Sequence, residues 1–197
     1  MERADASRIA HGELSLWNPL SEAALDETIA LLEPPPGGRV LDVACGRAEV
    51  LRRLAERFEV EATGYDSDAA LIESGPPGLE LLVRDTPPPG PFDVVLCIAA
   101  SHALGGASVD ELPDYSGLMR AAEQAGLTPL HSSVASEADW DRYEWRLILN
   151  AERWAAANPE DPGADVLRER ARHARERMTM PGGRETLGFA LVLLRRD

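Results

Sequence analysis

The stretch that decides the fold is Val40-Leu41-Asp42-Val43-Ala44-Cys45-Gly46-Arg47-Ala48-Glu49. The apolar residues at its start predict a short buried strand over Arg39–Val43, and Gly46 opens a turn of small residues. Apolar and charged residues then recur at helical spacing over Glu49–Arg57, which predicts an amphipathic helix. Such a turn lets a backbone approach a ligand closely and directs the N–H groups of the following helix at it. The stretch therefore predicts a ligand site at the carboxyl end of the strand.

Strand and helix patterns alternate on both sides of this stretch. Helical spacing over Ser21–Leu32 precedes it, and three more strands are predicted over Val60–Tyr65, Leu79–Val83 and Phe92–Ala99. This alternation predicts an α/β fold with a mainly parallel twisted sheet flanked by helices. The second half predicts helices over Leu118–Ala125, Asp139–Ala157 and Pro162–Met178, a strand over Leu127–Val134, and a buried, antiparallel final strand over Leu187–Leu194. The arginines and glutamates of the last helix are expected to form a solvated face with ion pairs.

Acidic residues follow successive predicted strands. Asp66 follows the second strand, about 20 residues after Gly46, and an acid at that offset commonly accepts hydrogen bonds from ribose hydroxyls. Asp85 follows the third strand, and Asp93 begins the fourth. Each acid taken alone is an ordinary turn residue. Their joint placement at strand ends predicts a ligand site along this edge of the sheet.

Charge and composition exclude several classes of function. The 197 residues include 34 acidic and 20 basic ones, so the net charge is −14, which opposes binding to phosphate backbones and anionic lipid. All the basic residues are arginine, so Schiff-base chemistry, pyridoxal phosphate attachment and a lysine-bearing phosphate loop are excluded. The G-x-G-x-x-G fingerprint of dinucleotide-binding domains is absent. We expect neither a nucleic-acid partner nor a membrane partner.

Cysteine usage and the chain start indicate the compartment. Cys45 and Cys97 lie in apolar stretches without metal-ligand spacing, so neither a disulfide framework nor a metal site is expected. The first residues lack the apolar core of a signal peptide, and no apolar run approaches the roughly 20 residues that span a bilayer. These features predict a cytoplasmic protein.

The motifs LDVACGRAE, GYDSD, VRDT and PFDVVLCIAASHAL together resemble class I S-adenosylmethionine-dependent methyltransferases of the small-molecule type. The resemblance runs from about Ile9 to Ala103 and resumes from about Leu112 to the C-terminus. It implies a Rossmann-like sheet and a single methyltransferase-like domain over residues 1–197. Residues 1–33 would form an N-terminal helical segment that covers the cofactor site.

The resemblance implies S-adenosylmethionine as the cofactor and distributes its parts along the strand ends. The implied cofactor contacts are Asp42, Ala44, Cys45 and Gly46 under the methionine part, Asp66 and Ser67 at the ribose, Asp85 and Thr86 at the adenine, and Ile98 and Ala99 near the transferring methyl group.

Substrate-side candidates come from three parts of the chain. His102, at the end of the fourth strand, is the candidate general base, with a structural histidine as the alternative, and Ser101 lies beside it. His11 belongs to an N-terminal run that either closes over the cofactor or caps the sheet. On the helix Asp139–Ala157, Tyr143, Leu147 and Trp154 share a core-facing side, whereas Glu144 and Trp145 point elsewhere and could face a ligand.

The chain departs from the family pattern in two ways. Alanine replaces the outer two glycines of the first motif, at Ala44 and Ala48. Only the residues Gly105–Glu111 stand where the family has a helix and a fifth strand, so the fold is apparently shortened there. The crossover between Asp66 and Leu79 is also short.

The predicted function is methyl transfer from S-adenosylmethionine to a small-molecule acceptor. The departures support an alternative, a non-catalytic methyltransferase-like binding or scaffold protein. The strand-end acids alone would also suit a nicotinamide oxidoreductase. No Asn-Pro-Pro-aromatic motif follows the fourth strand, which argues against methylation of nucleic-acid bases. The oligomeric state stays open.

Overall fold

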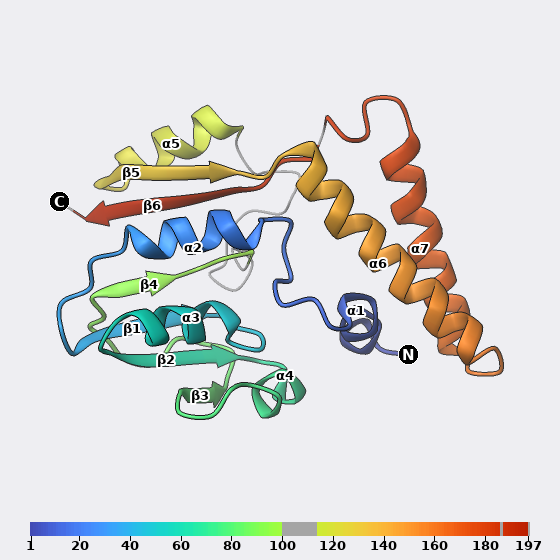
Figure 1. Ribbon diagram of the computed structural model, residues 1–197, viewed down its shortest axis with the longest axis horizontal. Coiled ribbons are helices and arrows are strands. Elements are labelled where there is room, and N and C mark those ends of the chain that lie inside the picture. The colour runs from blue at the N-terminus through green and yellow to red at the C-terminus, as the bar shows by residue number, and fades with distance from the viewer. Residues whose placement is uncertain (100–113, 186, 197) are drawn as a thin grey trace. The chain divides into compact units, whose positions relative to one another are not determined.

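The structure is a computed structural model that describes residues 1–99, 114–185 and 187–196 (Figure 1). The chain forms two compact units. One consists of Met1–Glu22 and Val134–Ala190 and is helical, and the other consists of Ala23–Ser133 and Leu191–Asp197 and contains the four-stranded sheet.

The sheet of the second unit is parallel, in the order β3-β2-β1-β4. Its strands are β1 (Gly38–Val43), β2 (Val60–Asp66), β3 (Glu80–Val83) and β4 (Val94–Leu96). The central strand β1 is buried along nearly its whole length because it has a neighbour on each side. Val43 pairs with Tyr65, and Asp66 pairs with Val83, so the carboxyl ends of β1, β2 and β3 lie in register at one edge.

The helices of this unit continue the predicted alternation. α2 (Glu22–Ala30) precedes β1, and α3 (Glu49–Arg57) follows it with Leu51 and Leu54 fully buried. On the exposed side of α3, Arg52 is paired with Glu49 and Glu56. The crossover from β2 to β3 is α4 (Ala69–Glu73), a helix of five residues, which accounts for the short segment noted in the sequence.

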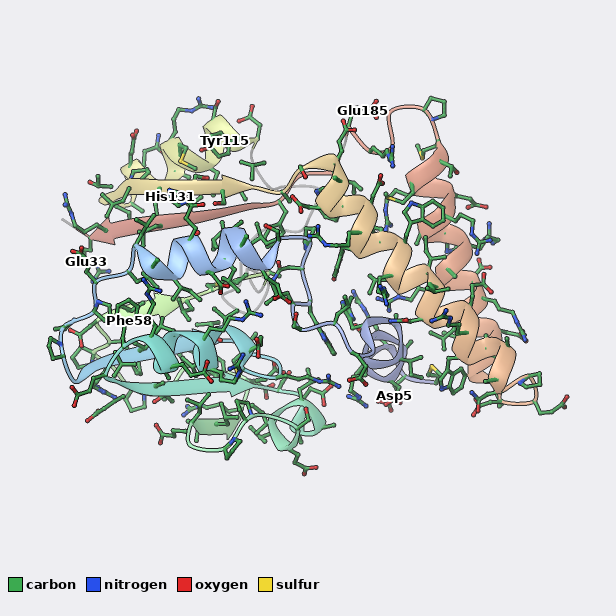
Figure 2. All side chains as sticks on the ribbon, in the orientation of Figure 1. Asp5, Glu33, Phe58, Tyr115, His131 and Glu185 are labelled. Carbon is green, nitrogen blue, oxygen red and sulfur yellow. The ribbon has the colours of Figure 1, made fainter. Side chains whose placement is uncertain are left out.

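Two further strands form a separate antiparallel pair, β5 (Leu127–Val134) with β6 (Ala190–Arg196), and α5 (Tyr115–Gln124) precedes β5 (Figure 1). Tyr115, at the start of α5, is 50% exposed (Figure 2). The prediction that the final strand is buried is wrong: its first four residues are half-buried and its last three exposed. The reason is that β6 pairs with β5 and is not inserted into the four-stranded sheet. The predicted shortening, at residues 105–111, lies outside the described residues.

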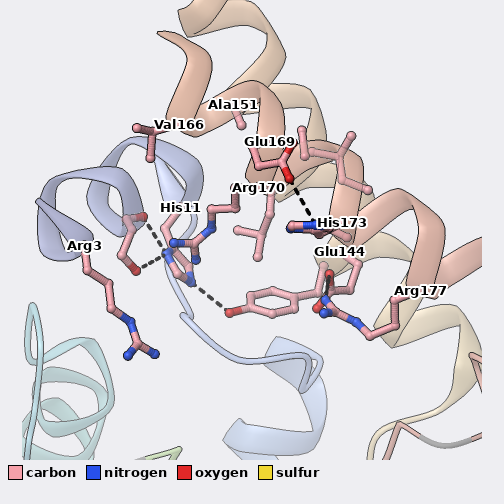
Figure 3. Close-up of a pocket in the computed structure, with 15 residues that line it drawn as sticks. Arg3, His11, Glu144, Ala151, Val166, Glu169, Arg170, His173 and Arg177 are labelled. Atoms are coloured by element: carbon pink, nitrogen blue, oxygen red, sulfur yellow. Dashed lines mark hydrogen bonds and ion pairs between the residues drawn. The ribbon is translucent and has the colours of Figure 1, made fainter. Parts of the chain in front are cut away.

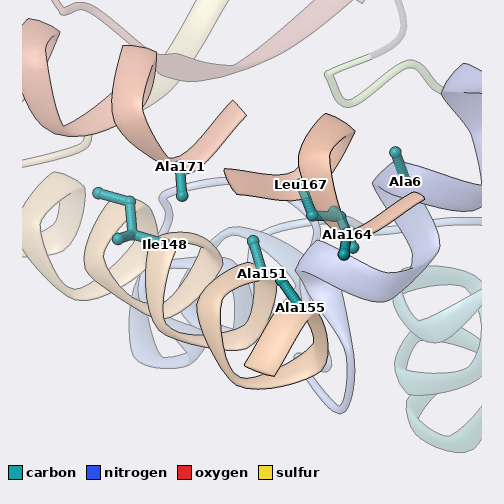
Figure 4. Packing of buried hydrophobic residues seen from close by; sticks show 7 residues of the cluster. All are labelled: Ala6, Ile148, Ala151, Ala155, Ala164, Leu167 and Ala171. Carbon is teal, nitrogen blue, oxygen red and sulfur yellow. The ribbon is translucent and has the colours of Figure 1, made fainter. Parts of the chain in front are cut away.

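The helical unit consists of α1 (Arg3–His11), α6 (Glu137–Ala157) and α7 (Gly163–Thr179). Small side chains allow these helices to approach closely, and they bury a cluster of mostly alanine residues (Figure 4). Its members are Ala6, Ile148, Ala151, Ala155, Ala164, Leu167 and Ala171. A capping box between Ser136 and Asp139 fixes the start of α6. None of the described helices combines the length and apolar character needed to cross a membrane.

Most predicted elements are confirmed. α3 and β5 have the predicted bounds, and α6 and α7 begin or end within two residues of the predicted positions. β4 is shorter than predicted. The N-terminal run from His11 to Ser21, whose composition did not indicate a core, is buried or half-buried except at Glu13 and Ser15. α1 lies within the N-terminal helical segment, residues 1–33, that the resemblance implied, although no local pattern gave its bounds. Trp154 packs against the alanine-rich cluster as expected.

Candidate functional site at the carboxyl edge of the sheet

The turn after β1 has an unusual backbone. Ala44, Gly46 and Ala48 have φ angles of 50°, 56° and 57°, so every second residue is in the left-handed region. Glycine adopts this conformation without steric cost, whereas alanine is strained in it. These are the positions at which the resembling family has glycine. The two alanines therefore preserve the shape of the turn at a cost in backbone strain.

Asp66, at the end of β2, holds this turn against the neighbouring strands. Its Oδ2 accepts a hydrogen bond from the Gly46 N–H at 3.0 Å, and its Oδ1 accepts one from the Asp68 N–H at 2.8 Å. The Cys45 N–H donates to the Tyr65 carbonyl oxygen at 2.9 Å, which joins the turn to β2. Each carboxylate oxygen has a second lone pair, so Asp66 can still accept hydrogen bonds from a ligand.

Asp42, at the end of β1, is 4% exposed. Its burial, and secondarily the negative charge of Asp66, raise the pKa of Asp42 to about 7. No hydrogen bond to its carboxylate is found within the described ranges. Burial also raises the pKa of Cys45 to about 12, with the charges of Asp42 and Asp66 adding to the effect. Cys45 is therefore a neutral thiol at physiological pH and is not an activated nucleophile.

Two glycines have contrasting surroundings. A Cβ at Gly46 would have no atom within 4 Å, so the space beside this backbone is open to a ligand. A Cβ at Gly64 would lie 2.8 Å from the Cys45 Sγ atom, so a glycine is needed there for β2 to pack against the turn. Gly64 and Asp68 were not among the predicted site residues, although both belong to the GYDSD motif.

The other predicted cofactor contacts lie at or after the ends of neighbouring strands. Ser67, Asp85, Thr86 and Ala99 are exposed, and Ile98 is half-buried. The Arg84 N–H donates to the Asp66 carbonyl oxygen at 2.9 Å, which ties the segment that carries Asp85 to the end of β2. Ala99 also has a left-handed backbone, with φ of 58°. The predicted residues Ser101 and His102 lie outside the described part of the chain.

The remaining two candidates belong to the helical unit. His11 is buried (Figure 3), its ring stacks on Trp17 at 4.1 Å, and its Nε2 lies 2.8 Å from the Tyr143 hydroxyl oxygen. Trp145 is 41% exposed on α6. Glu144, which was expected to point away from the core, is buried because it forms an ion pair with Arg177 at 2.8 Å.

Within the described ranges, no group of three or more histidine, cysteine, aspartate or glutamate side chains is arranged to hold a metal ion. Both cysteines are free thiols.

The fold is similar to that of several solved structures. No family model matches the chain. The uncharacterized protein YjhP of Escherichia coli (strain K12) is 24% identical over 238 residues, which cover 94% of this chain and 96% of YjhP. The X-ray structure of YjhP superposes with a TM-score of 0.84 at 21% identity, and the superposition covers 98% of this chain and 99% of the YjhP chain.

Two S-adenosylmethionine-dependent methyltransferases, both in complex with S-adenosyl-L-homocysteine, are also similar. The Thiobacillus denitrificans structure has a TM-score of 0.79 at 20% identity, covering 100% of this chain and 99% of that chain. The Geobacter sulfurreducens structure has a TM-score of 0.81 at 19% identity, covering 98% of each chain. These likenesses confirm the predicted Rossmann-like methyltransferase fold.

The alignment with YjhP is longer than this chain, at 238 residues against 197. YjhP therefore contains residues within the aligned region that have no counterpart here.

Proposed function

We propose that the chain binds S-adenosylmethionine at the carboxyl edge of its four-stranded sheet and transfers the methyl group to a small-molecule acceptor. The observation that carries the proposal is Asp66, held by the Gly46 and Asp68 N–H groups beside a turn with an open backbone. The fold supports it, since the similar methyltransferases were crystallised with S-adenosyl-L-homocysteine, the product left after methyl transfer.

The residues present fit this cofactor. Asp66 has lone pairs left for two ribose hydroxyls, and its hydrogen bonds to backbone N–H groups fix the direction of its carboxylate. Asp42 places a second acidic group on the same edge, where a cationic ligand favours its ionised form. The open space beside Gly46 leaves room for close approach to the backbone.

The cofactor, when bound, supplies a methyl group that its sulfonium centre already activates. The chain's own task is to hold the acceptor atom in line with that group and to keep water out, which needs few catalytic residues. We propose His102 as the base that takes the proton of an acceptor hydroxyl or amine at a ring nitrogen. His11, Ser101 and Trp145 stay predicted acceptor contacts.

Calorimetric titration of the full chain with S-adenosylmethionine and S-adenosylhomocysteine tests the proposal. A ligand that binds only the folded state, at a hundred times its Kd, stabilises it by about 2.7 kcal/mol, so we expect melting to rise by several degrees. No heat and no shift at millimolar ligand would refute the proposal. Tighter binding of NAD than of S-adenosylmethionine would instead support an oxidoreductase.

Two observations favour a second candidate, a non-catalytic methyltransferase-like binding protein. The motif carries strained alanines at two glycine positions, and the chain is shorter than YjhP within the aligned region. Cofactor binding without turnover on a broad panel of hydroxyl, amine and thiol acceptors would support this candidate. Methylation of any of these acceptors would exclude it.

A further inference from the structure

The helical unit contains a cleft of about 620 Å³ between α1, α6 and α7 (Figure 3). All the residues that line it belong to this one unit. A cleft of this volume is in the range of sites that hold small organic molecules.

The cleft is positively charged in a strongly acidic protein. Among its lining residues, Arg177 is paired with Glu144 at 2.8 Å, and His173 lies 3.1 Å from Glu169. Arg3 and Arg170 also line it, and the side chain of neither forms an ion pair or hydrogen bond with a residue in the described ranges. The Arg177–Glu144 pair is neutral, and Glu169 is also paired with Arg172 at 2.5 Å, so two guanidinium groups of the lining have no acidic partner in the described ranges, in a chain with a net charge of −14.

Arg170 is the more informative of these two arginines because it is half-buried. A guanidinium group stays protonated at any physiological pH, so partial burial without a counter-ion costs free energy. Arg170 extends from α7 toward His11 (Figure 3), and its positive charge acts on Tyr143. An anion in the cleft would supply the missing partner.

His11 and Tyr143, which also line the cleft, are hydrogen-bonded to each other and to the backbone. The His11 Nδ1 donates to the Ser7 carbonyl oxygen at 2.7 Å, which leaves Nε2 facing the Tyr143 hydroxyl. That hydroxyl also lies 3.1 Å from the Trp17 carbonyl oxygen.

The remaining surface of the cleft is apolar. Ile148, Ala151 and Ala171, which belong to the alanine-rich cluster, contribute to its lining, as does Val166, which is 43% exposed. A ligand that matches both surfaces has an apolar body and one anionic group.

We propose that this cleft binds a small organic acid, with its carboxylate at Arg170 and its apolar body against α6 and α7. The inference does not depend on methyl transfer, because every residue that carries it lies in the helical unit.

The test is titration of the full chain with phenylacetate, phenylacetamide and inorganic phosphate, followed by nuclear magnetic resonance of the aromatic side chains. We expect saturable binding of phenylacetate, at least tenfold weaker binding of the isosteric neutral amide, and weak binding of phosphate, which has no apolar body. Arg170→Gln should weaken phenylacetate binding about tenfold without lowering the melting temperature, because it removes an uncompensated charge.

Arg146→Gln is the matched control. Arg146 is exposed on α6 and does not line the cleft, so its substitution should leave phenylacetate binding unchanged. Equal binding of phenylacetate and phenylacetamide, or equal losses in the two arginine variants, would overturn the inference. So would the absence of saturable phenylacetate binding. None of these outcomes bears on cofactor binding, which the titration with S-adenosylmethionine measures separately.

Discussion

The left-handed backbone at the alanines after β1 predicts whether substitution by glycine stabilises or destabilises the fold. Ala44 has φ of 50° and is half-buried, and a left-handed conformation costs an L-residue about 1–2 kcal/mol. Glycine removes this strain but makes the unfolded chain more flexible, which costs about 0.4–1 kcal/mol. We therefore expect Ala44→Gly to stabilise the protein by about 0.5–1 kcal/mol.

Substitutions at Ala48 and Gly46, the other left-handed positions of the turn, are expected to change the free energy of unfolding by different amounts. Ala48 has φ of 57° but is fully buried, and loss of its methyl group costs about 0.8 kcal/mol, so Ala48→Gly should be close to neutral. Gly46 has φ of 56° and open space at its Cβ position, so Gly46→Ala should destabilise by about 0.5–1 kcal/mol through strain alone.

Urea denaturation measures these changes, and a melting temperature shift of about 2–4 °C per kcal/mol gives a second readout. Ala121→Gly is the matched control. Ala121 is exposed within α5, so the same substitution should cost about 1 kcal/mol there. If Ala44→Gly destabilises as much as Ala121→Gly does, Ala44 is not strained and the reasoning is refuted.

Three further predictions concern the site and α7. Asp66→Ala should weaken S-adenosylmethionine binding at least tenfold in calorimetry while the fold persists, since a hydrogen bond to a charged group contributes about 1.5–3 kcal/mol; Asp93→Ala, at the amino end of β4, is the control. His102→Ala should remove the rise in rate with pH and lower the rate roughly 10²–10⁴-fold, with cofactor affinity retained; unchanged turnover would exclude a base. Replacing Arg172 and Arg175 together by glutamine should leave the melting temperature nearly unchanged, because their ion pairs with Glu169, Glu176 and Glu152 are exposed.

Local sequence patterns predicted most of the helices and strands. They predicted the position of a candidate site residue only where that residue lies at the end of a strand. Asp42 and Asp66 could be placed because parallel strands bring their carboxyl ends to one edge. The contact of His11 with Tyr143 could not, since 132 residues separate the two and no local periodicity links them. The burial of Glu144 could not be predicted either, because its ion-pair partner, Arg177, lies on another helix.

The strain at Ala44 and Ala48 was also not readable from residue type, since alanine usually indicates a right-handed backbone. The separation of β5 and β6 from the four-stranded sheet depends on which strands pair, and the pattern of a single strand does not specify its neighbour.

Asp42 makes the stability of the fold depend on pH in a direction opposite to that of a salt-bridged acid. Burial raises its pKa from the usual 3.8 to about 7, so the folded state binds a proton more tightly than the unfolded state does. Below pH 4 Asp42 is protonated in both the folded and the unfolded state, so no free energy is spent on burying its charge. As pH rises from about 4 to about 7, the unfolded chain loses its proton first and the stability falls.

The shift corresponds to at most about 4 kcal/mol above pH 7. Asp42→Asn removes the charge and keeps the size of the side chain, so it should raise the melting temperature at pH 8 and change it little at pH 4.5. The measurement is thermal denaturation of wild type and variant across this range, with Asp93→Asn as the control, because Asp93 is exposed. An equal effect of Asp42→Asn at both pH values would show that folding does not raise the pKa of this carboxyl group, and the reasoning would be refuted.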